Sequence, residues 1–197
     1  MNIAFVINDL ASFKPTQSTA TLVAHCAHRG HSVWVMELGD LSYGETGASG
    51  GLARPVSALA SYVPDSFTTS ASLGSPAYVD LGAMDLLWLR SNPGRDPERP
   101  WAHAFLLDLG QVLQSRGVRV LNDPEGLRKG STKLYGLELS AEVRPQSIVT
   151  RDKEAIVDAV KTWGEAVIKP LLGSQGRDVF RVKASDLSNV NQIIATI

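Results

Sequence analysis

The chain has 197 residues, and 44% of them are hydrophobic, which is enough to bury one large core or two small ones. Nineteen basic and twenty acidic side chains leave a net charge of -1, which excludes a general binder of the nucleic-acid backbone because such proteins carry a strongly basic face. The apolar run at the amino terminus is too short to cross a bilayer and follows no basic region, so we expect neither nucleic acid nor a membrane as a partner.

Short apolar runs that alternate with helical patterns predict a parallel sheet in the first part of the chain. The runs are rich in β-branched side chains, and the segments between them place apolar residues at helical spacing before a glycine. Strands separated by helices form parallel sheets covered on both faces, so we expect an α/β fold. The predicted strands are residues 2–8, 32–38, 85–90 and 118–122, and the predicted helices are residues 19–30 and 101–117.

The segment from Tyr43 to Met84 departs from this pattern. It is rich in Gly, Ser, Ala and Pro and shows only weak alternation of apolar and polar residues. We predict a flexible insert here, a loop that carries a short hairpin or flap. We expect it to be the least ordered part of the chain.

Polar residues follow the predicted strands at the point where each strand ends. The carboxyl ends of parallel strands meet at one edge of the sheet, where open α/β folds bind their ligands. This edge is therefore the candidate substrate face. The residues expected there are Asn8, Asp9, Glu37, Arg90 and Asn122.

A second unit begins after Asn122, where the pattern changes. An Asp-Pro pair opens a predicted helix over 123–140, and Asp152 caps another helix that ends at Gly164. We divide the chain into a domain over 1–122 and a unit over 123–197, which is small for an independent domain and indicates a fragment of a longer protein. The predicted strands of this unit are residues 145–150, 166–172 and 178–183, and a last helix starts in the final segment, 187–197.

Lys169 stands inside an apolar run, and a Gly-x-x-Gly segment from Gly173 to Gly176 follows it. A lysine among apolar residues needs an exit to solvent or an anion to meet. The backbone N–H groups of a glycine turn can bind a phosphate, and a lysine on the preceding strand adds a positive charge for the same anion. The pattern indicates a nucleotide clamp, with a plain hairpin whose lysine reaches solvent as the alternative.

Other kinds of site are disfavoured. The cluster of His25, Cys26, His28 and His31 lacks a carboxylate or a second cysteine at ligand spacing, so we expect no metal site and an inert thiol. The chain has neither the glycine pattern of a P-loop nor that of a dinucleotide-binding turn, and it lacks the Gly-x-Ser-x-Gly elbow of serine hydrolases. The single cysteine fits a reducing compartment, and we place the protein in the cytoplasm.

Four segments together resemble the bacterial glutathione synthetases of the ATP-grasp superfamily. They are VMELGDLSY, LLWLRSNPGRD, VLNDPEGLRKGSTKLY and AVIKPLLGSQGRDVFRV. The last two are the more specific, because a lysine in the helix after Asn-Asp-Pro and a second lysine in an Ile-Lys-Pro strand recur across the superfamily. The resemblance implies a Rossmann-like pre-ATP-grasp domain, a parallel sheet with flanking helices, followed by an incomplete α+β ATP-grasp subdomain.

The resemblance also implies roles for particular residues. Arg90 would lie near the peptide substrate, with a structural ion pair as its alternative role. Asn8 and Asp9 match a position of substrate contacts, although the residues after them differ from the family. The residues that would bind ATP are Lys133, Lys169, Gly173, Ser174, Gln175 and Gly176.

In this family a carboxylate is activated by ATP and Mg2+ as an acyl phosphate, and an amine then displaces the phosphate. This chemistry implies a small-molecule peptide or amino-acid substrate. The magnesium ligands and the catalytic arginine of the family would lie beyond Ile197, so we expect the chain alone to be inactive. A truncated clamp would also expose apolar surface, which would favour a homo-oligomer.

Two alternative functions stay open. The loop GSQGRD, residues 173–178, is closer to that of ligases that add glutamate to a ribosomal-protein tail than to the glycine-richer loop of glutathione synthetases. From a different class, the chain could be a complete, non-catalytic module that binds a nucleotide or a partner.

Overall fold

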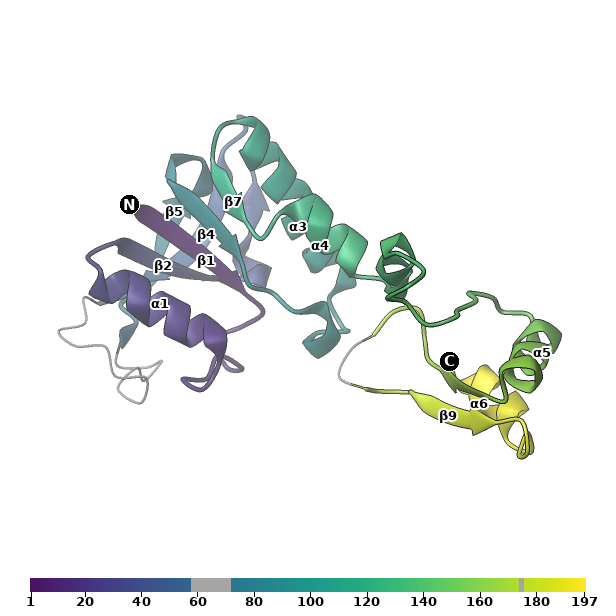
Figure 1. Ribbon diagram of the computed structural model, residues 1–197. Coiled ribbons are helices and arrows are strands. Elements are labelled where there is room, and N and C mark those ends of the chain that lie inside the picture. The colour runs from purple at the N-terminus through teal and green to yellow at the C-terminus, as the bar shows by residue number, and fades with distance from the viewer. Residues whose placement is uncertain (58–71, 174–175) are drawn as a thin grey trace. The chain divides into compact units, whose positions relative to one another are not determined.

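The computed structural model describes residues 1–57, 72–173 and 176–197. They form two compact units, Met1–Arg128 and Lys129–Ile197 (Figure 1). Within the described residues, no helix is both long and apolar enough to cross a membrane. Each unit has its own hydrophobic core.

The first unit is built around one mixed sheet. Its parallel part has the order β2-β1-β6-β7, which agrees with the predicted strands and with the α/β class. Residue pairs such as Ala4↔Trp34 and Ala4↔Leu87 fix the register of β1 against both neighbours. The strands are β1 (Asn2–Ile7), β2 (Ser32–Glu37), β6 (Leu86–Leu89) and β7 (Arg119–Leu121).

Helices α1 (Ser18–His28) and α3 (Pro100–Ser115) cover opposite faces of this sheet (Figure 1). Alternate residues of β1 face the two helices, and Phe5 packs on the α1 side whereas Val6 packs on the α3 side. Both side chains are fully buried, which is why residues 3–7 are all apolar. As predicted, glycines follow the two helices, and Gly30 and Gly117 have positive φ angles of 79° and 93°.

The predicted insert is more regular than expected in the residues that the structure describes. Its central part, 58–71, lies outside them. On either side the chain forms antiparallel strands, which agrees with the predicted hairpin, but these strands extend the sheet and do not form a separate loop. Glycine was misleading because Gly50 and Gly51 allow close backbone approach; a Cβ on Gly50 would lie 2.0 Å from the carbonyl oxygen of Val79. The added strands are β3 (Ser42–Tyr43), β4 (Ser49–Pro55) and β5 (Ala77–Asp80).

Short 3-10 helices and one short α-helix complete the first part of the chain. They are η1 (Leu38–Asp40), η3 (Leu81–Ala83), η4 (Pro93–Arg95) and α4 (Pro124–Gly130). The helix predicted over 123–140 is therefore interrupted. The Gly-Ser-Thr sequence at 130–132 is a poor helix former, and the next turn, η5 (Lys133–Glu138), is a separate 3-10 helix.

The second unit has a small core made by Val160, Val182 and Val190. Asp152 caps α5 as predicted, because its Oδ1 accepts hydrogen bonds from the N–H groups of Glu154 and Ala155. The strand predicted over 145–150 was wrong, since this proline-containing segment has no regular structure. The remaining elements are α5 (Lys153–Trp163), the antiparallel pair β8 (Glu165–Ile168) and β9 (Phe180–Lys183), and α6 (Val190–Thr196).

Candidate functional site

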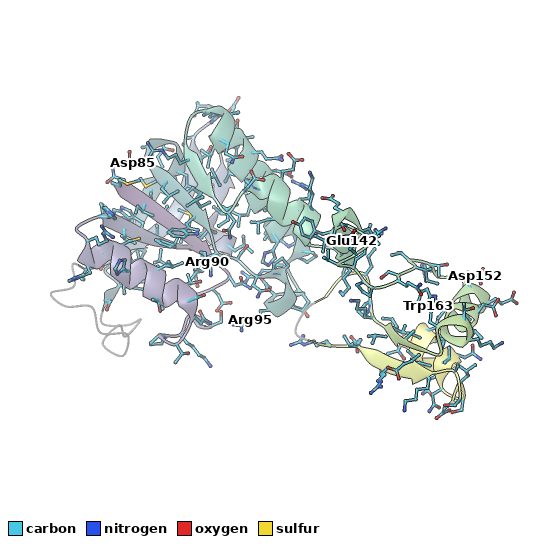
Figure 2. The ribbon with its side chains drawn as sticks, in the orientation of Figure 1. Asp85, Arg90, Arg95, Glu142, Asp152 and Trp163 are labelled. Atoms are coloured by element: carbon cyan, nitrogen blue, oxygen red, sulfur yellow. The ribbon has the colours of Figure 1, made fainter. Side chains whose placement is uncertain are left out.

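A cleft of about 710 Å³ lies at the carboxyl ends of β1, β6 and β7 in the first unit. The loops after these strands and the start of α1 form its walls. Arg90 and Arg95 both belong to this edge (Figure 2). Four of the five polar residues expected at the edge line the cleft, namely Asn8, Asp9, Arg90 and Asn122, whereas Glu37 does not.

Arg90 extends from the end of β6 to the first turn of α1. Its Nε donates to Thr19 Oγ1 at 3.1 Å, and its Nη2 donates to Ser18 Oγ at 3.2 Å. No carboxylate within the described part of the chain lies at ion-pair distance from this guanidinium. The positive charge is therefore oriented by hydroxyl groups and is available to an anionic ligand.

Asn8 joins two loops of the cleft. Its Nδ2 donates to the carbonyl oxygen of Asn92 at 2.9 Å, and its Oδ1 accepts the backbone N–H of Asn92 at 2.6 Å. The neighbouring Asp9 accepts the backbone N–H of Ser12 at 2.6 Å and stays partly exposed. Since the Asn8 amide is used in this reciprocal pair, the loops after β1 and β6 are held as one unit.

A buried polar cluster lies behind the cleft wall. Arg99 binds Asp96 through Nε at 3.1 Å and Nη2 at 2.9 Å, and the same Nη2 donates to the carbonyl oxygen of Asn8 at 3.3 Å. His103 of α3 connects Asp96 with Ser91: Nε2 lies 3.2 Å from Asp96 Oδ2, and Nδ1 lies 3.2 Å from Ser91 Oγ. The Asp96 and His103 side chains are only 8% and 6% exposed.

Sequence reasoning missed this cluster. Asp96, Arg99 and His103 stand in a proline-rich loop and at the start of a helix, where charged residues are ordinarily solvated. One signal was present, because His103 occupies a core-facing position in the apolar pattern of α3. The contacts of Arg99 with Asn8 and Asp9 join segments that are distant in the sequence. The other contacts lie within residues 91–103, where no apolar or helical pattern predicts which polar side chains pair.

The titration of His103 should make the stability of the first unit depend on pH. Burial lowers the pKa of His103 from its ordinary value of 6.5, and the hydrogen bond to Asp96 acts in the opposite direction. As the pH falls, His103 therefore becomes protonated at a higher pH in the unfolded chain than in the folded chain. The contribution of His103 to stability is complete above about pH 6.5 and decreases below it.

Urea unfolding at about pH 7.5 and about pH 5.5 tests this expectation. The wild type should lose more free energy of unfolding between the two values than His103→Gln, which cannot titrate. An equal loss in the two proteins would contradict the assignment of a depressed pKa to His103.

In the second unit, Lys133 lies against the loop after β8. Its Nζ donates to the carbonyl oxygens of Leu171 at 3.3 Å and Gly173 at 3.1 Å, and its backbone N–H also donates to Leu171. Burial lowers the pKa of Lys133, and the positive charge of Lys169 lowers it further. Neither lysine has an ion-pair partner in the described ranges. This pair of lysines is therefore the candidate anion site of the second unit.

Lys169 itself is exposed, so it has the exit to solvent that was one of the two possibilities for a lysine in an apolar run. The strand ends at Ile168, and the next residues, including Leu172 at 62% exposure, lie in a long connection to β9 instead of a tight hairpin. Gly173 and Gly176 have φ angles of 110° and 73°, which favour glycine. The other two predicted ATP contacts, Ser174 and Gln175, lie outside the described residues.

The sequence model of the family described as prokaryotic glutathione synthetase, N-terminal domain, matches residues 1–128. The model described as prokaryotic glutathione synthetase, ATP-grasp domain, matches residues 132–197. The chain belongs to the prokaryotic glutathione synthetase family. This membership confirms the resemblance on which the lysine and arginine assignments depend, although those assignments themselves stay predictions.

Curated relatives of this glutathione synthetase family member agree with the assignment. A glutathione synthetase of Gloeobacter violaceus is 34% identical over 197 residues, which cover 98% of this chain and 58% of the relative. A glutathione synthetase of Xanthomonas axonopodis pv. citri is 31% identical over 198 residues, which cover 100% of this chain and 59% of the relative. The chain thus spans somewhat more than half the length of the relatives that it matches.

Solved structures support the fold of this family member. A D-cycloserine synthetase superposes with a TM-score of 0.59 at 19% identity, over 98% of this chain and 54% of the other. The ATP-grasp ligase PsnB bound to a minimal precursor gives 0.56 at 19% identity, over 98% and 61%. At this identity the likeness concerns the fold alone, and it confirms the predicted α/β pre-ATP-grasp and ATP-grasp architecture.

Proposed function

We propose that this chain is part of an ATP-dependent ligase that joins a carboxylate to an amine, as in glutathione synthesis, with γ-glutamylcysteine as the acid and glycine as the amine. The first unit would be the substrate-side domain, and the second unit would be the beginning of the ATP-grasp domain. A cytoplasmic location belongs to the same proposal.

The observation that carries the proposal is the presence of one candidate anion site in each unit. The cleft with Arg90 belongs to the unit that matches the N-terminal domain of the family, and the Lys133–Lys169 pair belongs to the unit that matches its ATP-grasp domain. A ligase of this kind needs both, because it must hold an acidic substrate and the phosphates of ATP.

The charges of the cleft support an acidic substrate. Its described lining contains three cationic side chains, Lys14, Arg90 and Arg95, and one carboxylate, Asp9. A concave surface with an excess of positive charge concentrates anions. Arg90, which its hydroxyl partners hold in place, is suited to a carboxylate group of the peptide. Asp9 could bind the ammonium group of the same molecule.

In the proposed reaction, one carboxylate oxygen of γ-glutamylcysteine attacks the γ-phosphorus of ATP and ADP leaves. The amine of glycine then attacks the carbonyl carbon, and phosphate leaves with the former carboxylate oxygen. Lys133 and Lys169 would stabilise the negative charge of the phosphates during the first step. Arg90 would hold the acid substrate in place.

Mg2+ accompanies ATP in the chemistry proposed for the whole enzyme. The described residues contain no group of three or more His, Cys, Asp or Glu side chains that could hold a metal ion. The described residues of the two candidate sites therefore do not supply a magnesium centre.

Replacing Arg90 tests the substrate-side half of the proposal. In the product of the complete gene, Arg90→Ala should raise the KM for γ-glutamylcysteine by roughly 10- to 100-fold, the range for the loss of a charge-assisted contact, and should leave the KM for ATP unchanged. Arg29→Ala, which removes an exposed arginine after α1, is the control. An unchanged KM for γ-glutamylcysteine in Arg90→Ala would remove Arg90 from the substrate site.

Release of phosphate from ATP tests the proposed function as a whole. The complete gene product should release phosphate only when γ-glutamylcysteine and glycine are both present. If phosphate release required glutamate and a ribosomal-protein tail instead, the protein would be a glutamate-adding ligase. Failure to release phosphate with either set would leave a binding module and would contradict the proposal.

A further inference from the structure

The buried cluster of Asp96, Arg99 and His103 has no role in the proposed reaction. None of the three residues lines the cleft, yet two of them are almost fully buried and all three are hydrogen bonded. Burying charged and titratable groups costs free energy. Their burial next to the cleft therefore suggests that they have a role in it.

The contacts of the cluster lead to the segments that form the cleft. Arg99 holds the loop after β1 through the carbonyl oxygen of Asn8, at 3.3 Å, and lies 3.9 Å from Asp9. His103 holds the loop after β6 through Ser91 Oγ, at 3.2 Å. Asp96 binds both, and it thereby connects the two loops to helix α3.

The hydrogen-bonding pattern of His103 follows from its partners. An ionised Asp96 can only accept, so Nε2 of His103 carries the proton and donates to it. In the neutral ring Nδ1 is then an acceptor, and the Ser91 hydroxyl donates to it. Ser91 is the residue immediately after Arg90, and its side chain is therefore fixed to α3 while that of Arg90 is directed to α1.

We infer that His103 is a positioning residue for the substrate cleft: it acts through Ser91 and holds the Arg90 guanidinium in the orientation that binds the acidic substrate. This inference rests on the proposed function for the identity of the substrate, but the orientation of Arg90 can be measured without it. Arg90 and Ser91 are neighbours in the chain, and their side chains bind helices on opposite faces of the sheet. Loss of the Ser91–His103 hydrogen bond would therefore allow the backbone that carries Arg90 to move.

Variants of His103 separate its two bonds. In His103→Gln the terminal amide can reach the place of Nε2 and keep the hydrogen bond to Asp96, but the hydrogen bond with Ser91 is lost. In His103→Asn the shorter amide can reach the place of Nδ1 and keep the hydrogen bond with Ser91, but the hydrogen bond to Asp96 is lost. Ile3→Val is the control for destabilisation alone, because Ile3 is 2% exposed and stands at the opposite end of β1 from the cleft.

Two readouts test the inference in these variants. The first is the NMR signal of the Arg90 Nε–H in the 197-residue chain, which reports the bond to Thr19. It should shift or broaden in His103→Gln and stay in place in His103→Asn and Ile3→Val. The second is the KM for γ-glutamylcysteine of the complete gene product, which should rise about fivefold in His103→Gln, as expected for one lost hydrogen bond, with kcat unchanged.

The outcomes distinguish the inference from the function on which it depends. An Arg90 signal that is identical in wild type and His103→Gln, or that changes equally in Ile3→Val, would overturn the positioning role. A wild-type enzyme that does not use γ-glutamylcysteine would overturn the proposed function, while the Arg90 signal would still decide whether His103 positions this side chain.

Discussion

Replacing Leu106 with alanine is expected to lower the free energy of unfolding of the first unit by about 2–5 kcal/mol. Leu106 is completely buried on α3, where it packs with the parallel strands in the core on that face of the sheet. The substitution removes apolar contacts and leaves a cavity that the surrounding strands cannot close fully. Urea unfolding followed by tryptophan fluorescence measures the change.

Val112→Ala on the same helix is the matched control. Val112 is 36% exposed, so truncating it removes few contacts, and we expect a change within about 0.5 kcal/mol. If Leu106→Ala were as mild as Val112→Ala, α3 would not be packed on the sheet as described. The substrate cleft, which depends on α3 through His103, would then lose its support.

Lys169→Ala is expected to weaken the binding of ATP by about 1–3 kcal/mol, or roughly 5- to 150-fold in Kd. Lys169 is exposed in the second unit and has no ion-pair partner among the residues with described positions. Burial lowers the pKa of Lys133 and the positive charge of Lys169 lowers it further, so the charges of the two ammonium groups interact. Isothermal titration of the complete gene product with ATP measures the loss of affinity.

The control for this variant is Lys161→Ala. Lys161 lies on α5 and forms only an exposed pair with Asp158 at 4.0 Å, so its removal should leave the Kd for ATP unchanged. Equal affinities for ATP in the wild type and Lys169→Ala would remove Lys169 from the nucleotide site. A loss of equal size in Lys161→Ala would indicate a general effect of charge.

The parallel half of the sheet could be predicted because its strands β1, β2 and β6 are largely buried on both faces. Such strands are apolar throughout, and the helices between them end at glycines, so both the elements and the α/β class follow from local patterns. Strand β4 could not be predicted in this way. Its glycines are required by close backbone neighbours, a tertiary cause that in sequence is indistinguishable from a loop.

In the candidate sites too, the residues placed by strand topology could be predicted and those placed by tertiary contacts could not. The carboxyl ends of predicted parallel strands identified Asn8 and Arg90 as cleft residues, because topology alone brings strand ends together. The partners that orient Arg90, Ser18 and Thr19, could not be predicted, since hydroxyl groups at a helix start serve equally well as caps. The apolar pattern continues to Leu172, whereas the strand ends at Ile168, so the pattern alone could not show that Lys169 lies outside the strand.

The transfer of an oxygen atom tests the central proposal most directly. γ-Glutamylcysteine with 18O in the carboxylate that reacts would be incubated with ATP, glycine and the product of the complete gene, and the released phosphate would be analysed by mass spectrometry. A ligase that forms an acyl phosphate must release phosphate carrying one 18O atom for each glutathione made. Phosphate without 18O would mean that ATP is hydrolysed by water, and it would contradict the assignment of this chain to a carboxylate–amine ligase.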